Sequence, residues 1–230
     1  MTTCLYPFLS RSMHFVVLFA ISSLFVSILS ESDVKSKLKC PVIGDNIVFC
    51  FPDEHHMNRG DLLKTLPKLG KEWEVSLEFK ATKSALSRPT EPTDQANIIQ
   101  LQIPNLTTKY GGSIVSISTK PDQDLYFSSF LSDQDGEQMI AAFNGIQLVD
   151  KWTSIRVSQQ RIQINGEKSM EYRQTIEIDG RPVARRPIPV PKEFTNVRVF
   201  ASGHEFPAQS GYIRNFVIQD GNTGVHNFYV

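Results

Sequence analysis

The chain carries no excess charge of either sign. Its 230 residues contain 24 Lys and Arg against 24 Asp and Glu, so the formal net charge at pH 7 is zero. Nucleic-acid binding normally requires a strongly basic face, and this balance argues against DNA or RNA as a partner. The absence of any block of like charges also argues against an acidic, calcium-sequestering tail.

Motifs for phosphate and metal chemistry are missing as well. The sequence has no Gly-rich loop that would cradle phosphates and no Cys-x-x-Cys pair. His55, His56 and His204 stand apart from further ligands, and a zinc site needs more ligands than are placed together here. We therefore expect no cofactor, unless one acidic loop binds calcium.

Only one long apolar run is present, and it lies near the start of the sequence. Arg11 supplies a positive charge, the run extends over 15–29, and the small residue Ser30 is followed at once by charges. This order is typical of a secretory signal peptide. We expect residues 1–30 to be removed and residues 31–230 to be secreted, with no transmembrane anchor. An uncleaved signal anchor is the alternative. It is disfavoured because a stable span needs about 20 apolar residues and this run is shorter.

Cysteine is scarce, and the few residues present fit secretion. Cys4 would leave with the signal peptide, and in an oxidising compartment the remaining close pair, Cys40 and Cys50, is expected to form a disulfide. Closing so short a loop contributes on the order of 3 kcal/mol in the chain-entropy model. A nucleophilic or metal-binding thiol is the alternative. A single sequon predicts Asn105 as a glycan acceptor.

Short runs that alternate between apolar and polar residues make up the rest of the chain. The clearest is 73–80, where Trp73, Val75, Leu77 and Phe79 are expected to face inward. Further strands are expected over 42–51, 97–103, 113–118, 124–131, 139–143, 152–157, 172–178, 181–184, 197–201, 212–218 and 225–230. The only helix-like piece is a possible turn over 61–66, capped by Asp61 and stopped by the following proline.

The spacing of these strands predicts the fold class. Regular short strands without intervening helices indicate an antiparallel sandwich or barrel. About 200 residues remain after removal of the signal peptide, which is enough for a core and within the usual range for one domain. We therefore expect one all-β domain over residues 31–230.

Four segments carry a resemblance to known proteins: DLLKTLPKLGKEWEVSLEF (61–79), WTSIRVSQ (152–159), FTNVRVFAS (194–202) and PAQSGYIRNFVI (207–218). They are similar to a group of animal extracellular domains in the concanavalin A-like lectin and laminin G-like superfamily. The resemblance implies an antiparallel two-sheet jelly-roll sandwich in a secreted or cell-surface module that binds glycans or proteins. Its motifs are strand cores and turns, so it assigns no binding residue.

A glycoside hydrolase on this fold would need two carboxylates flanking one sugar bond. Hydrolases of the superfamily commonly carry them on one strand as Glu-x-Asp-x-x-Glu. The nearest match begins at Glu177 and lacks the second glutamate, and its Asp179-Gly180 is better explained as a type I′ hairpin turn. We therefore expect no catalytic residues and no enzyme activity, with a glycan-processing enzyme as the less favoured alternative.

Three carboxylates within five residues form a candidate calcium site. Asp133, Asp135 and Glu137 offer the oxygen ligands that calcium prefers, and they resemble the first half of an EF-hand loop. The remaining ligands of that loop are absent. Asp and Gly in the loops of a sandwich also serve merely to turn the chain.

Arg181, Arg185 and Arg186 lie among prolines and form a candidate glycan or anion site. Guanidinium groups suit bidentate contact with sulfate or carboxylate. The alternative, which we favour, is an edge strand that charge and proline protect against aggregation. Trp73 and Trp152 are able to stack on sugar rings, but both begin alternating strands and are expected to be core residues.

The sequence as a whole predicts a secreted, non-enzymatic recognition module that binds a glycan or an extracellular protein. A structural protein of the extracellular matrix is the main alternative. A glycan array separates the two, because a structural protein would show no saturable binding.

Overall fold

A computed structural model describes residues 46–82, 95–104, 112–120, 123–130, 138–144, 146, 148–163 and 169–221. Several predictions fall outside these residues: the signal peptide, Cys40, Asn105, the acidic loop with Asp133, Asp135 and Glu137, and the strand over 225–230. The described part contains strands and no helix. The strands are β1 (Ile47–Phe51), β2 (His55–His56), β3 (Leu62–Leu69), β4 (Trp73–Ala81), β5 (Ala96–Gln102), β6 (Ser113–Lys120), β7 (Gln123–Phe130), β8 (Gln138–Phe143), β9 (Thr153–Gln163), β10 (Met170–Ile178), β11 (Arg181–Ile188), β12 (Phe194–Phe200) and β13 (Gly211–Asp220).

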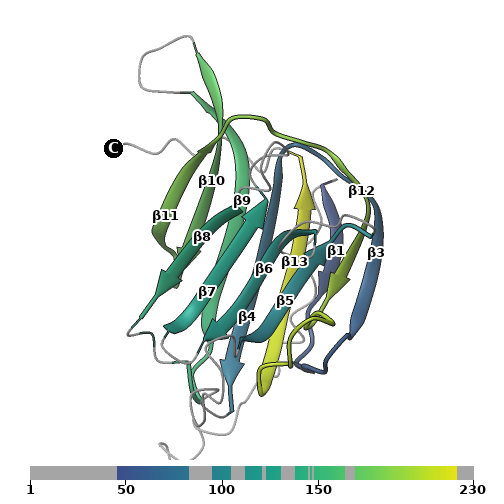
Figure 1. Cartoon of the computed structure of the whole chain (residues 1–230), viewed down its shortest axis with the longest axis vertical. Helices are drawn as coiled ribbons and strands as arrows, with labels where there is room; N and C mark the ends of the chain where they lie inside the picture. The colour runs from purple at the N-terminus through teal and green to yellow at the C-terminus, as the bar shows by residue number, and fades with distance from the viewer. Residues whose placement is uncertain are drawn as a thin grey trace, which may run out of the picture. The chain divides into compact units, whose positions relative to one another are not determined.

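The strands form two antiparallel sheets, seen as two overlaid layers in Figure 1. Sheet A has the order β1-β13-β4-β9-β10-β11, with β2 paired to β13, and sheet B has the order β3-β12-β5-β6-β7-β8. Strands distant in sequence are neighbours in space, as when β13 lies between β1 and β4. This architecture is an antiparallel two-sheet jelly-roll sandwich, and it confirms the predicted fold class.

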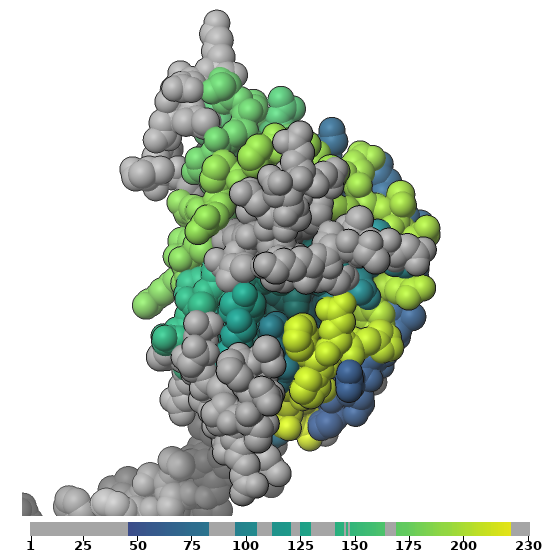
Figure 2. All heavy atoms as spheres, viewed as in Figure 1, coloured from purple at the N-terminus to yellow at the C-terminus, as the bar shows by residue number. Residues whose placement is uncertain are grey.

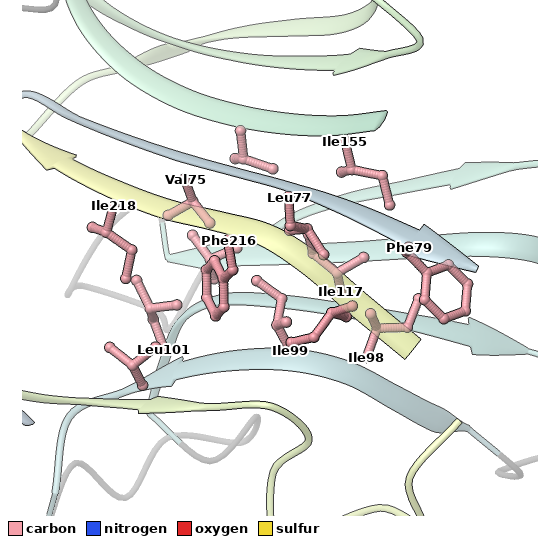
Figure 3. Packing of buried hydrophobic residues seen from close by; sticks show 14 of the residues in the cluster. Val75, Leu77, Phe79, Ile98, Ile99, Leu101, Ile117, Ile155, Phe216 and Ile218 are labelled. Atoms are coloured by element: carbon pink, nitrogen blue, oxygen red, sulfur yellow. The ribbon is translucent and has the colours of Figure 1, made fainter. Parts of the chain in front are cut away.

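The hydrophobic core lies between the sheets. From β4, Val75, Leu77 and Phe79 point into it, and Ile99 and Ile117 enter from sheet B (Figure 3). All five side chains are buried. Moving each of them from water into the core is favourable by about 1.5–3 kcal/mol. The predicted alternation along β4 is therefore correct, because one face of the strand meets the opposite sheet and the other does not.

The expected helical turn over 61–66 is wrong, since residues 62–66 belong to β3. Leu66 pairs with Val197 of β12, and Leu66 and Leu69 are buried in the core. β3 is the first strand in the order of sheet B, so only β12 pairs with it among the described strands. Pro67 is tolerated there because an edge strand leaves some of its N–H groups without a ladder partner.

The hairpin between β10 and β11 turns as the sequence predicts. Asp179 has a φ of 50° and Gly180 a φ of 74°, so both central residues are left-handed. That is the requirement of a type I′ turn, whose twist matches the twist of the flanking strands. The Asp179 carboxylate accepts hydrogen bonds from Ser154 N at 2.9 Å and from Lys151 Nζ at 3.2 Å.

These contacts make the stability of the hairpin depend on pH. The backbone hydrogen bond from Ser154 holds the pKa of Asp179 below its ordinary value, and Lys151 lowers the pKa further. A lowered carboxyl pKa stabilises the fold above the unfolded pKa, and this stabilisation is lost as pH falls through the folded pKa. We expect wild type to exceed Asp179→Asn in unfolding free energy at pH 7, and the difference to shrink below about pH 4.

Denaturant melts of both proteins at pH 7, 5 and 3 measure this difference. It should not exceed about 1 kcal/mol at pH 7, because the side chain is 43% exposed and water screens its charges. A difference in unfolding free energy that stays constant over this pH range would show that the Asp179 carboxylate does not stabilise the fold through its lowered pKa.

The loop over 201–210 joins β12 to β13 and fastens the segment that contains β2. Gly60 N donates to Ser202 O at 3.1 Å, and Arg59 Nε donates to His204 O at 2.9 Å. In Figure 2, yellow residues from late in the chain lie against blue residues from its early described part. The loop thus holds β2 beside β13, where His56 is opposite Tyr212.

Candidate functional site

The outward face of sheet A gathers charged and aromatic side chains. Leu77 of β4 pairs with Ile155 of β9, and both point into the core, so the residues that alternate with them point outward. The outward-facing residues of the central strands are Glu74, Ser76, Glu78 and Lys80 of β4, Ser154, Arg156 and Ser158 of β9, Thr175 and Glu177 of β10, and Tyr212 and Arg214 of β13.

Trp152 lies on this face, immediately before β9. Thr153 is fully buried and pairs with Phe79, so the residue before it points outward. Asp150 N donates to Ala81 O at 2.9 Å, which holds this segment beside the end of β4. Trp152 is half-buried, so the expectation that it is a core residue is wrong. Trp73 is buried, as predicted.

Two cations contact the Trp152 indole. Lys80 Nζ lies 4.7 Å from the ring centroid and Arg214 Cζ lies 4.0 Å from it. Lys80 Nζ is also 5.6 Å from the centroid of Tyr212, whose ring meets the ring of His56 edge-on at 5.3 Å. We call Trp152, Lys80, Arg214, Tyr212 and His56 the Trp152 surface. Its residues come from β2, β4, β13 and the position immediately before β9.

The two cations of this surface differ in their charge partners. Arg214 pairs with Glu78 at 2.6 Å, and Asn215 Nδ2 donates to the other oxygen of the same carboxylate at 3.1 Å. Within the described ranges, Lys80 makes no ion pair and its contacts are with the two rings. The Trp152 surface therefore presents one ammonium group that is in ion-pair contact with no described carboxylate.

A second charged group adjoins this surface on the same face. Arg156 Nε donates to Glu177 Oε2 at 2.9 Å, and Arg156 Nη1 lies 3.7 Å from Glu74 Oε2. Glu177 and Glu74 are 6% and 8% exposed, although both lie on the outward face of sheet A. Their burial fits a carboxylate that is paired, since an unpaired buried charge is costly. Glu177, the start of the nearest hydrolase match, is thus held in an ion pair.

The arginines of the predicted anion site lie along β11, which ends the strand order of sheet A. This edge position, with Pro182 and Pro187 in the strand, is what the protected-edge interpretation expects. Side chains alternate along a strand, so Arg185 and Arg186 point to opposite sides of the sheet. The structure does not bring Arg181, Arg185 and Arg186 to one point. Anion binding by them stays a prediction.

The remaining candidates that lie among the described residues form no metal site there. Among the described residues, no three His, Cys, Asp or Glu side chains are placed to hold one metal ion. Cys50 lies in β1 opposite Val217, and its pairing with Cys40 stays a prediction. His55 contacts Asp61 at 2.6 Å. Over the same described ranges, no helix has the length and apolarity needed to cross a membrane.

Comparisons with known proteins give no family. No family model and no curated protein matches the chain. Similar solved structures include the receptor-binding domain of botulinum neurotoxin type G (14% identity, TM-score 0.46, 78% of this chain and 43% of that one). Domains LG4-5 of the mouse laminin alpha1 chain are 11% identical with a TM-score of 0.48, and the match covers 79% of this chain and 44% of that one. A heptameric SAP-like pentraxin from Limulus polyphemus is 11% identical with a TM-score of 0.45, and the match covers 73% of this chain and 76% of that one. The chain spans less than half the length of the neurotoxin and laminin structures. Sequence identities of 11–14% transfer no function from these proteins.

Proposed function

We propose that this protein is a secreted, non-enzymatic recognition module that binds glycans through the Trp152 surface. One observation carries the proposal. A half-buried indole lies on an outward sheet face, with two cations against it and a second aromatic ring beside one of them. A tryptophan that served only the core would point between the sheets, as Trp73 does.

The chemistry of this surface suits a sugar. A sugar ring has an apolar C–H face and a polar rim of hydroxyl groups. The flat face of Trp152 or Tyr212 packs against C–H groups, and the charged groups of Lys80, Arg214 and Glu78 form strong hydrogen bonds with hydroxyls. Because Glu78 already holds Arg214, less side-chain freedom is lost when a ligand binds.

Two further points support the non-enzymatic and secreted parts of the proposal. Two carboxylates on the outward face of sheet A, Glu78 and Glu177, are both engaged by arginines, whereas a glycoside hydrolase needs one carboxyl as acid and another as nucleophile or base. The apolar run over 15–29 supports secretion.

An extracellular protein is the second candidate ligand. Trp, Tyr and Arg are the residue types that most often dominate the binding energy of protein interfaces, and Trp152, Tyr212 and Arg214 supply one of each. The same surface would then serve a protein partner.

A glycan array followed by calorimetry on the strongest ligand tests the proposal. We expect Trp152→Ala to weaken that binding about tenfold or more, which corresponds to about 1.4 kcal/mol, because the packing face is lost. Trp152→Phe should retain part of the affinity. Met170→Ala removes a 45% exposed side chain from another part of sheet A and is the matched control, with no expected change.

Equal glycan affinity for wild type and Trp152→Ala would refute the proposal. Silence on glycans, combined with Trp152-dependent binding to an extracellular protein, would favour the second candidate. Silence on both classes would favour a structural role in the matrix.

A further inference from the structure

We infer that the glycan recognised at the Trp152 surface carries an anionic group, a carboxylate or a sulfate, and that Lys80 binds it. The inference rests on the proposed function and specifies its class of ligand. It follows from the position of one ammonium group and from the charges around it.

The fold fixes the Lys80 ammonium in place. Lys80 is the penultimate residue of β4, points outward, and lies opposite Tyr212 in the antiparallel ladder. Its Nζ is within 4.7 Å of the Trp152 centroid and 5.6 Å of the Tyr212 centroid. The negative faces of aromatic rings attract a cation, so the two rings orient an otherwise flexible side chain. Rings do not satisfy three N–H donors, which remain available to an acceptor.

Among the cations of the outward face of sheet A that the structure describes, Lys80 is the one without an ion-pair contact. Arg214 is paired with Glu78, and Arg156 with Glu177 and Glu74. Across the described part of the chain, Lys80 has no carboxylate within ion-pair distance. A ligand carboxylate or sulfate would supply that contact through a charge-assisted hydrogen bond.

Two other lysines differ from Lys80 because each has a carboxylate partner within the protein. Lys68 pairs with Glu193 at 2.8 Å, and Lys151 with Asp179 at 3.2 Å, so these cations are neutralised within the protein. Lys120 lies 3.6 Å from the centroid of Tyr126 in sheet B. It lies on one ring, away from the Trp152 surface, and therefore provides a matched control for the loss of a ring-stacked charge.

The experiment compares charged oligosaccharides with their neutral counterparts. The carboxylate pairs are hyaluronan against carboxyl-reduced hyaluronan, and sialyllactose against lactose. The sulfate pair is keratan sulfate against desulfated keratan. Binding to wild type, Lys80→Gln, Lys80→Arg and Lys120→Gln is measured by calorimetry at one fixed salt concentration, because surface charge effects depend on salt.

We expect wild type to prefer the charged member of at least one pair by about tenfold or more, as for a hydrogen bond to a charged group. Lys80→Gln should remove that preference, because it lowers the affinity for the charged member far more than the affinity for the neutral member. Lys80→Arg should keep most of the preference, and Lys120→Gln should behave as wild type. Whether the preference arises in the carboxylate pairs or the sulfate pair identifies the anion.

The outcomes separate this inference from the proposed function. If neutral and charged members bind equally and Trp152→Ala weakens both, the glycan function stands and the anionic class is wrong. If the preference persists in Lys80→Gln, the anion is held elsewhere and the inference is overturned. If wild type binds neither member of any pair, the inference fails, and the glycan array decides the proposed function separately.

Discussion

Replacing Leu77 with alanine is expected to lower the free energy of unfolding by about 2–5 kcal/mol. Leu77 lies in the middle of β4, is 2% exposed, and points between the sheets toward Ile99 and Ile117 (Figure 3). Its truncation removes buried apolar contacts and leaves a cavity that the two sheets cannot close without moving. Because β13 and β9 flank β4, such a movement would involve three strands.

Leu62→Ala is the matched control for this measurement. Leu62 is also a strand leucine, in β3, but its side chain is 49% exposed. The same truncation there should change stability by no more than about 0.5 kcal/mol. Urea melts with a common m-value would compare the two variants directly. Equal effects would mean that Leu77 does not lie in an inter-sheet core.

The arrangement that places Leu77 in the core was predictable because one face of each strand is buried. A shift of one residue along β4 would turn Glu74, Glu78 and Lys80 toward the opposite sheet, at a cost of several kcal/mol, so the alternation specifies the register strongly. The Asp179-Gly180 turn was predictable for a local reason. Only residues that tolerate positive φ fit both of its central positions.

The segment over 61–66 shows where local rules fail. An aspartate before a run of helix-forming residues, with a proline after it, matches the start and stop signals of a helical turn. In the structure, Leu66 and Leu69 are buried against β12, and pairing with that strand outweighs the local preference. A pattern read over six residues contains no information about a strand about 130 positions later in the chain.

Trp152 could have been placed correctly from the sequence. In the run over 152–157 the β-branched residues Ile155 and Val157 mark the inward positions. Trp152 has the same parity as Ser154 and Arg156, and this parity predicts an outward side chain. Its aromatic character suggested a core residue, but the period of two is the stronger signal in a strand with one buried face.

The partners of Trp152 were not predictable in the same way. Arg214 and Glu78 are 136 positions apart, and they meet because β13 pairs with β4 in one register. That ladder shifts between Arg214 and Val217, so even a correct pairing of the two strands would not give the side-chain neighbours along their whole length. The outward face of sheet A depends on tertiary pairing, whereas the inward faces follow from local alternation.

Gly211 is a position where this pairing is sensitive to a small change. Gly211 begins β13 and lies opposite Ala81, and a Cβ atom added to it would be 2.3 Å from Lys80 O and 3.0 Å from Ala81 Cα. Backbone atoms cannot rotate away as a side chain does, so β13 and β4 would have to separate. We expect Gly211→Ala to destabilise the fold by about 3 kcal/mol, at the upper end of typical overpacking.

Gly180→Ala separates this close approach from ordinary backbone strain. Gly180 has a φ of 74° and no atom within 4 Å of an added Cβ, so its substitution should cost only about 1 kcal/mol. Because Tyr212 and Lys80 flank the clash, Gly211→Ala should also weaken glycan binding at the Trp152 surface, and Gly180→Ala should not. Denaturant melts and calorimetry on both variants give the two readouts. Equal stability and equal affinity in the two variants would show that the close contact between β13 and β4 does not hold the Trp152 surface together.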